Sequence, residues 1–144
     1  ENLSQINLDD YLRYLGKSLF QFYGANIRGI TFSIDAAGIF VDINTAIPFG
    51  LIMNELISNS LKYGFPEKRR GEVSINVRRQ DHALRVEYRD TGVGISESLD
   101  WQNTRTLGLR LVQSLVSQLN GSITLDRREG TAFSMVLYEK GMKS

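Results

Sequence analysis

The 144-residue chain contains no cysteine. Disulfide bonds, thiolate metal sites and cysteine nucleophiles are therefore excluded, and the absence fits a reducing compartment. Long hydrophobic runs are also missing, because the longest, Ala46 to Met53, contains Pro48 and Gly50 and is far too short to span a bilayer. No secretory signal is visible. We therefore expect a cytoplasmic domain that makes no direct membrane contact, although its parent protein could carry an anchor.

The chain has no strong excess of charge of one sign, since its formal net charge is +1. Nothing in this balance favours nucleic acid as a partner, and the short cluster Lys68-Arg69-Arg70 is typical of a solvated loop. A hydrophobic content of 42% and a charged content of 23% are typical of a globular domain. We predict one domain over residues 1–144, with residues 1–7 as a linker and 140–144 as a tail. Because the first residue is Glu1 and not methionine, we expect a piece of a longer protein.

Hydrophobic periodicity predicts the order helix, two strands, helix, two strands, loop, helix, two strands. The expected helices span about 8–23, 45–64 and 108–119, and the expected strands span 27–35, 39–43, 73–77, 84–88, 123–126 and 131–138. Each pair of strands is predicted to form a hairpin, and the segment from Ser96 to Thr106 a polar loop. This order predicts an α/β, or α+β, two-layer sandwich: a mixed, mostly antiparallel sheet of about five strands plus a short hairpin, with three helices on one face.

The two longer helices carry recognisable start and stop signals. Asn7 or Ser4 can cap the first, and Gly24 ends it. The apolar face expected to pack on the core is Leu8, Tyr11, Leu12, Leu15, Leu19, Phe22 and Tyr23. Asn44 or Thr45 can cap the central helix, with Pro48 tolerated in its first turn. Its expected core face is Ile47, Leu51, Ile57 and Leu61.

A polar stripe interrupts this central helix within Asn54-Glu-Leu-Ile-Ser-Asn-Ser-Leu-Lys-Tyr63. Glu55, Asn59, Lys62 and Tyr63 follow the spacing i, i+4, i+7, i+8 and share one helical face. Taken singly, each is more simply a solvent-facing residue of an amphipathic helix. Together, on an otherwise apolar helix, they need a polar partner such as a nucleotide with its metal ion.

A second motif is Asp90-Thr-Gly-Val-Gly-Ile95, which follows a predicted strand. An ionised aspartate accepts hydrogen bonds but cannot donate them, so it selects adenine, whose six position carries an amine. Gly92 and Gly94 permit left-handed backbone and close approach to a base or phosphate. Taken alone, the motif is more simply an ordinary turn between strands.

A third motif is Thr106-Leu-Gly-Leu-Arg-Leu-Val112. Gly108 at the start of a helix leaves backbone amides exposed, and the helix dipole adds positive potential that suits phosphate oxygens. An ordinary helix start explains this motif alone. A polar loop and not a strand precedes it, which excludes a Rossmann fingerprint, and no Gly-rich loop ends in Lys-Ser or Lys-Thr, which excludes a P-loop.

In this order, the three motifs resemble the N box and the two glycine boxes of the Bergerat-fold, or GHKL, ATPases. This group contains sensor histidine kinases, type II topoisomerase ATPase domains, ninety-kilodalton heat-shock chaperones and MutL proteins. Gly130-Thr131-Ala132-Phe133 resembles the last motif of that group. The compact size and the short segment between the glycine boxes are most similar to the catalytic domain of a sensor histidine kinase. The second box has one glycine where many kinases have two, and Trp101 is the only aromatic residue between the boxes.

The resemblance implies that ATP and Mg²⁺ are the cofactors. Glu55 is then the catalytic base or orienter, Asn59 the Mg²⁺ ligand, Lys62 a phosphate contact and Asp90 the adenine contact, supported by Thr131. The further nucleotide contacts it implies are Tyr63, Gly92, Gly94, Ile95, Arg105, Thr106, Leu107, Gly108 and Leu109.

The resemblance also implies a histidine on an upstream dimerisation domain as phosphoacceptor, and a response regulator as the next partner in a two-component phosphorelay. The only histidine, His82, falls in a link between strands and is typical of a solvated turn. We therefore expect this chain alone to bind ATP without phosphorylating itself. Three alternatives share the fold: an ATP-hydrolysing clamp like the MutL and topoisomerase proteins, a serine kinase like the anti-sigma factors, and a nucleotide-binding module without catalysis, which the presence of Glu55, Asn59 and Asp90 disfavours.

Overall fold

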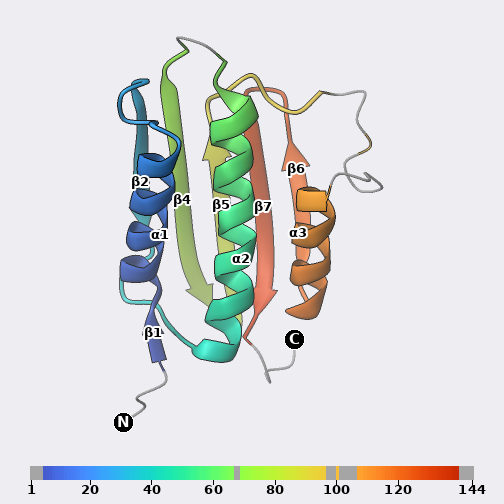
Figure 1. The fold of residues 1–144 in the computed structure, drawn as a ribbon. Coiled ribbons are helices and arrows are strands. Elements are labelled where there is room, and N and C mark those ends of the chain that lie inside the picture. The colour runs from blue at the N-terminus through green and yellow to red at the C-terminus, as the bar shows by residue number, and fades with distance from the viewer. Residues whose placement is uncertain (1–4, 67–68, 97–99, 101–106, 140–144) are drawn as a thin grey trace.

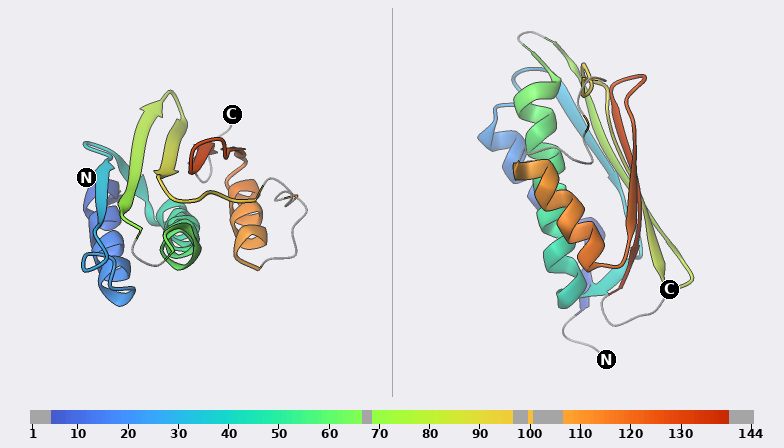
Figure 2. Two further views of the ribbon diagram at one scale, coloured as in Figure 1. Left: turned by 90° about the horizontal axis from the view of Figure 1, so that it is seen from above. Right: turned by 90° about the vertical axis from the view of Figure 1, so that its right-hand side faces the viewer.

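The computed structural model describes residues 5–66, 69–96, 100 and 107–139. Its three helices are α1 (Leu8–Phe22), α2 (Ile43–Asn59) and α3 (Leu107–Gln118). All three lie on one face of a five-stranded sheet, and the edge-on view in Figure 2 separates the two layers clearly. The predicted two-layer α/β sandwich is therefore confirmed.

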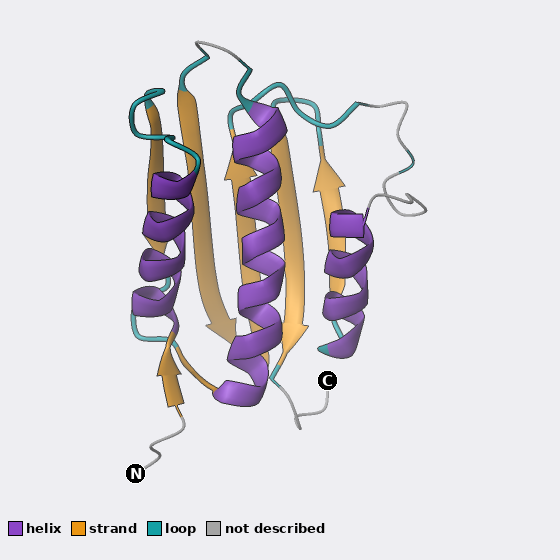
Figure 3. Cartoon of the chain, viewed as in Figure 1, coloured by secondary structure: helices purple, strands orange, loops and turns teal. Residues whose placement is uncertain are grey.

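The sheet has the order β2 (Ile30–Asp35), β4 (Gly71–Gln80), β5 (Ala83–Asp90), β7 (Thr131–Tyr138), β6 (Ser122–Asp126) (Figure 1). Strand β2 pairs with β4 in parallel, and the other neighbours are antiparallel. A separate two-stranded sheet joins β1 (Gln5–Asn7) to β3 (Phe40–Asp42). In Figure 3, β1 is the short arrow that leads into α1 from below. The hairpins β4–β5 and β6–β7 are as predicted.

The predicted hairpin between the strands expected at 27–35 and 39–43 is wrong. Strand β2 does not pair with β3, because the turn after Ala36, with Gly38 at φ +76°, leads the chain out of the main sheet. The chain then returns through α2 to β4, which lies parallel to β2. Parallel strands need such a crossover, usually a helix, whereas a two-residue turn joins only antiparallel strands. The central helix is thus the crossover of a βαβ unit.

Helix α1 is capped as predicted by Asn7, whose side-chain oxygen accepts from the Asp10 amide at 3.2 Å. Two apolar residues near its end are not core residues: Phe22 is 79% exposed and Ile27, expected in a strand, is 94% exposed. Phe20 is buried instead and packs against Phe32, with ring centroids 4.9 Å apart. Sequence spacing alone had assigned the wrong aromatic residue to the core.

The start and the buried face of α2 also differ from the prediction. Asp42 caps the helix, accepting from the Asn44 amide at 2.8 Å, so Pro48 lies inside the helix and not in its first turn. Ile47 and Leu51 are 55% and 45% exposed, whereas the predicted Ile57 and Leu61 are buried. Most residues of this helix are apolar, so periodicity does not identify the core-facing side. The apolar residues that are buried are Ala46, Phe49, Ile52, Met53, Leu56 and Ile57.

Helix α3 buries Leu109, Val112, Leu115 and Val116 and ends at Gln118, one residue before the predicted end, and the nearby Asn120 adopts φ +55°. Asn is one of the few residues that tolerate this left-handed conformation at the end of a helix. After α2 the backbone continues as one π-helical turn, η1 (Ser60–Gly64). Such turns are rare and occur mostly at functional sites.

Candidate functional site

A cavity of about 360 Å³ is lined by residues at the end of α2, the end of β5 and the start of β7. Figure 1 shows that these three ends lie at the same edge of the molecule. Its walls come from the helical layer, the sheet and the loop after β5, so it lies between the two layers of the sandwich. The residues that line it are Leu56, Asn59, Ser60, Tyr63, Gly64, Tyr88, Asp90, Gly94, Ile95, Leu109, Thr131 and Phe133. Seven of the positions proposed from the sequence are therefore brought together here: Asn59, Tyr63, Asp90, Gly94, Ile95, Leu109 and Thr131.

Asp90 is the buried acidic group of this cavity. It ends β5, is 2% exposed, and lies opposite Thr131 in the pairing of β5 with β7. Its Oδ1 accepts from the Gly92 amide at 2.9 Å, and its Oδ2 accepts from the Ser60 hydroxyl at 2.5 Å. An ionised carboxylate has about four acceptor positions, so two donors leave it able to accept more. Asp90 can therefore receive hydrogen bonds from a ligand in the cavity but cannot donate to one.

The glycines beside Asp90 are required by close backbone contacts. A side chain on Gly92 would begin 2.3 Å from the carbonyl oxygen of Gly64. Gly94 has φ +82°, and a side chain there would begin 2.8 Å from the carbonyl oxygen of Gly130. The loop after β5 is thus held between the end of η1 and the β6–β7 turn, which fixes one wall of the cavity.

The polar stripe of α2 does not continue as one straight face. The predicted face assumed an α-helix through Tyr63, but the π-helical turn from Ser60 changes the angle between successive residues. Glu55 and Asn59 remain half-buried on α2. Among the described residues, Lys62 is exposed and does not line the cavity, while Tyr63 lines it although 70% of it is exposed. Lys62 would need to change its orientation to contact a ligand in the cavity.

Glu55 and Asn59 lie against the first turn of α3. A side chain on Gly108 would begin 2.7 Å from Glu55 Oε1 and 3.6 Å from Asn59 Nδ2. Neither Glu55 nor Gly108 lines the cavity, but Asn59 borders both the cavity and this contact. A carboxylate, a carboxamide and the start of a helix therefore meet next to the cavity, in an arrangement suited to phosphate and its metal ion.

Arg28, which the sequence did not single out, supports the end of the central helix. Its guanidinium donates to the Leu61 carbonyl at 3.1 Å and also to the Phe65 carbonyl. Carbonyls at a helix end lack intrahelical partners, and a cation there also interacts favourably with the helix dipole. Arg28 therefore stabilises η1, and with it the position of Tyr63.

The sequence also missed Ser60 and Tyr88, two buried hydroxyl residues that line the cavity. The signals in the sequence were weak. Ser60 directly follows Asn59. Tyr88 lies two residues before Asp90, so Tyr88 and Asp90 point to the same face of β5. Burial raises the pKa of the Tyr88 phenol well above its ordinary value, so this hydroxyl keeps its hydrogen.

Some predicted residues cannot be placed. Arg105 and Thr106, together with Trp101, lie outside the described residues, and of Leu107 only the backbone is described. Within the described ranges, no cluster of three or more His, Asp or Glu side chains could hold a metal ion by itself. No described helix is long and apolar enough to cross a membrane.

Comparison with known families and proteins gives consistent matches. The profile of the family described as "Histidine kinase-, DNA gyrase B-, and HSP90-like ATPase" matches residues 44–141. Blue-light-activated histidine kinase 2 of Erythrobacter litoralis is 32% identical over 116 residues, which cover 79% of this chain and 34% of that protein. Sensor histidine kinase PdtaS of Mycobacterium tuberculosis is 32% identical over 92 residues, covering 62% of this chain and 18% of that protein. The chain thus spans about a third or less of the length of these relatives.

Solved structures show the same fold. The histidine kinase domain of a blue-light-activated histidine kinase from Erythrobacter litoralis superimposes with a TM-score of 0.83 at 27% identity, covering 95% of this chain and 69% of that one. The mycobacterial sensor histidine kinase MprB gives a TM-score of 0.73 at 19% identity, covering 96% of this chain and 98% of that one. The second likeness concerns the fold alone.

Proposed function

The chain belongs to the histidine kinase-, DNA gyrase B- and HSP90-like ATPase family, and we propose that it is the catalytic domain of a sensor histidine kinase that transfers the γ-phosphate of ATP to a histidine. One observation carries the proposal. Asn59 borders a cavity that holds the buried, accept-only Asp90, and it also borders the contact between Glu55 and Gly108. The base-reading and phosphate-binding groups are therefore contiguous.

Adenine is the base that the cavity suits. The amine at its six position donates to Asp90, whose carboxylate keeps free acceptor positions after binding Gly92 and Ser60. Leu56, Ile95 and Phe133 provide apolar surface for the flat ring. Guanine places a carbonyl where adenine has the amine, and two acceptors would then face each other. The site therefore favours ATP over GTP.

The phosphates are proposed to extend past Asn59 toward the first turn of α3. The Asn59 carboxamide supplies an oxygen ligand of the kind that Mg²⁺ accepts, and the described residues fit a divalent ion whose other ligands are phosphate oxygens and water. When bound, Mg²⁺ neutralises phosphate charge. The amides near Gly108, and Lys62 after a change of orientation, add positive potential there. Positioning and charge stabilisation account for most of the catalysis in such a transfer.

Glu55 is proposed to serve the nucleophile. A histidine nitrogen forms the bond to the γ-phosphorus as the bond to the β,γ-bridging oxygen breaks, and ADP leaves with that oxygen. Glu55 accepts a hydrogen bond from the other ring nitrogen, or removes its proton, and so orients the ring. The half-buried carboxylate lies beside Gly108, at the proposed phosphate end of the site.

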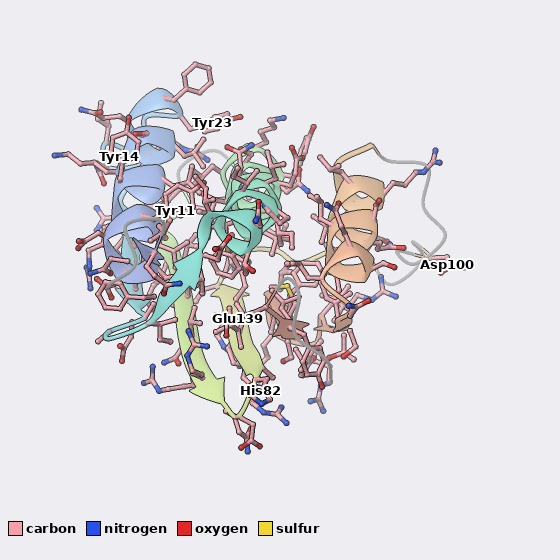
Figure 4. The ribbon with its side chains drawn as sticks, turned by 90° about the horizontal axis from the view of Figure 1, so that it is seen from below. Tyr11, Tyr14, Tyr23, His82, Asp100 and Glu139 are labelled. Carbon is pink, nitrogen blue, oxygen red and sulfur yellow. The ribbon has the colours of Figure 1, made fainter. Side chains whose placement is uncertain are left out.

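The phosphoacceptor is proposed to lie on a dimerisation domain of the same protein, and a cytoplasmic response regulator to receive the phosphoryl group. His82 is the only histidine of the chain and is exposed at the tip of the β4–β5 hairpin, away from the helical layer that carries Glu55 (Figure 4). It is thus poorly placed to react at this site. The relatives are kinases considerably longer than this chain, which is consistent with further domains.

Mixing the chain with radiolabelled Mg-ATP and a separately produced helical domain that carries a phosphoacceptor histidine tests the proposal. We expect acid-labile, base-stable phosphohistidine on the added domain, and none when Glu55→Gln replaces the wild type. Rapid ATP hydrolysis without phosphohistidine would instead indicate a clamp ATPase. Acid-stable phosphoserine on a partner would indicate a serine kinase, and no ATP binding would contradict the proposal altogether.

A further inference from the structure

Four oxygen atoms form a buried chain beneath the cavity. Asp90 Oδ2 lies 2.5 Å from Ser60 Oγ, which lies 2.6 Å from Tyr88 Oη. Tyr88 Oη can in turn donate to the Leu56 carbonyl oxygen, 3.0 Å away. None of these four residues is more than 5% exposed. Two hydroxyl groups therefore connect the acidic group of the cavity to the backbone of α2.

These four oxygen atoms make three contacts but share only two hydrogens. With Asp90 ionised, only the Ser60 and Tyr88 hydroxyls carry hydrogens, whereas three contacts need one each. In two of the possible patterns Ser60 donates to Asp90, while Tyr88 donates either to Leu56 or to Ser60. In the third, Ser60 donates to Tyr88 and Tyr88 donates to Leu56, which leaves Asp90 Oδ2 without the Ser60 hydrogen. Asp90 and Tyr88 thus compete for one hydroxyl hydrogen.

Donation from Ser60 to Asp90 defines what the cavity offers to a base. Gly92 holds Asp90 Oδ1 at 2.9 Å and Ser60 holds Oδ2, so the plane of the carboxylate is fixed from both sides. The Ser60 hydrogen points at Asp90 and not into the cavity, although both residues line it. Both oxygens then present only lone pairs to a ligand. A bond from a hydroxyl to a carboxylate is charge-assisted and roughly twice as strong as a neutral one, which favours this pattern.

We propose that Ser60 is a specificity-determining residue for base recognition, because its hydroxyl fixes the Asp90 carboxylate in an accept-only arrangement that requires an amine on the base. The inference rests on the proposed ATP binding and deepens it. Ser60 acts through Asp90 and is therefore a positioning residue. Without Ser60 the carboxylate is held by Gly92 alone and can turn, so that it accepts from a ring N–H as readily as from an exocyclic amine.

Inosine triphosphate is the appropriate probe, because its base has a carbonyl at the six position and an N–H beside it. The dissociation constants of Mg-ATP and Mg-ITP are measured by titration calorimetry on the wild-type chain and on Ser60→Ala. We expect Ser60→Ala to weaken ATP binding by about tenfold and to lower the preference for ATP over ITP by a similar factor. Ser60→Cys, which keeps the size but not the strong donor, is a second variant and should show the same loss.

Two controls separate this role from simple loss of a buried polar group. Tyr88→Phe removes a hydroxyl from the same chain and also removes the acceptor that competes for the Ser60 hydrogen, so the preference for ATP should be kept or increased. Ser58→Ala removes a buried hydroxyl from α2, two residues before Ser60, at a position that does not line the cavity, and should leave the preference unchanged. Circular dichroism verifies that each variant is folded.

The outcomes are distinct. A wild-type chain that binds neither nucleotide would overturn the proposed function and this inference with it. If the wild type binds ATP but Ser60→Ala and Ser60→Cys keep the wild-type preference, only the role of Ser60 is overturned. An equal loss of preference in Tyr88→Phe would also overturn it, because the effect would then come from general disruption of the network.

Discussion

The carbonyl oxygen of Gly64 lies where a side chain on Gly92 would begin, only 2.3 Å from that Cβ position. The same oxygen accepts a hydrogen bond from the Val93 amide at 2.8 Å. The end of the central helix and the loop after β5 are thus joined backbone to backbone. Tyr63 directly precedes Gly64, and Asp90 lies two residues before Gly92. This contact therefore fixes the distance between two walls of the cavity.

We expect Gly92→Ala to lower the free energy of unfolding by about 1–3 kcal/mol, since the fixed backbone of Gly64 must move to admit a methyl group. It should also weaken ATP binding at temperatures where the variant is fully folded. Chemical denaturation and titration calorimetry measure the two effects. Unchanged ATP affinity in the folded variant would show that this contact does not shape the site.

Gly38→Ala is the matched control for that variant. Gly38 has φ +76° and no heavy atom within 4 Å of its would-be side chain, so the substitution costs backbone strain of about 1 kcal/mol without a steric clash. The turn it occupies connects β2 to β3, away from the cavity lining. Loss of stability with unaltered ATP affinity is expected.

Asp90→Asn tests adenine recognition. An asparagine keeps the shape of the side chain but presents an NH₂ group, so one of the donors around it, or the base amine, loses its acceptor. We expect ATP affinity to fall by roughly 1–3 kcal/mol, the cost of leaving a buried polar group unpaired. Asp35→Asn, at the exposed end of β2, is the control. Equal calorimetric affinities for wild type and Asp90→Asn would contradict the adenine assignment.

Asn59→Ala tests the proposed metal ligand. If the carboxamide holds Mg²⁺ against the phosphates, the dependence of ATP affinity on Mg²⁺ concentration should be largely lost in this variant, while the affinity in EDTA stays close to that of the wild type. Titrations of nucleotide at several Mg²⁺ concentrations give both values. Asn54→Ala, one turn earlier on the same helix and outside the cavity lining, should keep the Mg²⁺ dependence. An Asn59→Ala variant that does the same would exclude the metal role.

Several of the motif residues line one cavity because local sequence determines their positions strongly. Asp90 and Thr131 each border a glycine-containing turn, and pairing of β5 with β7 places them opposite each other. The pairing of strands that are far apart in the sequence was harder to predict. Alternation in residues 30–35 identifies a strand but not its neighbour, and only the length of α2 indicates that β2 must find a parallel partner.

Other features were beyond the sequence for different physical reasons. The apolar residues of α2 surround much of the helix, so Ile47 and Leu51 looked as suited to the core as Ile57. Nothing in the local sequence predicts the π-helical turn that begins at Ser60. The contact of Ser60 with Tyr88 joins residues 28 positions apart, and only the packed structure shows that the Ser60 hydrogen has two possible acceptors, Asp90 and Tyr88.

Asp9 is expected to contribute a pH-dependent part of the stability. Its carboxylate accepts from Arg13, which is the larger cause, and from the Ala36 amide at 3.0 Å, and both lower its pKa below the ordinary value. A carboxyl group with a lowered folded-state pKa stabilises the fold above its unfolded pKa of about 4, and this stability is lost as pH falls through the folded pKa. Asp9→Asn should therefore reduce stability at pH 7 and flatten its decrease below about pH 4.

The control is Asp10→Asn, which removes a neighbouring carboxylate from the same first turn of α1 but not the link to Ala36. Denaturation by urea at a series of pH values from neutral to acid gives the stability profiles. Parallel profiles for Asp9→Asn and the wild type would show that this carboxylate has the same pKa in the folded and unfolded states.

Gly108→Ala separates the phosphate end of the site from the stability of the fold. The added methyl group would lie 2.7 Å from Glu55 Oε1, the mobile end of a long side chain, so Glu55 can move aside without disturbing the backbone. Alanine is also the better helix former, by up to about 1 kcal/mol in a helix interior. We therefore expect unchanged or slightly increased thermal stability, together with at least about a tenfold loss of phosphotransfer to an added histidine domain, because about 1.4 kcal/mol of lost orientation by Glu55 has that effect on rate. Full phosphotransfer by this variant would mean that Glu55 does not act from the position it occupies beside α3.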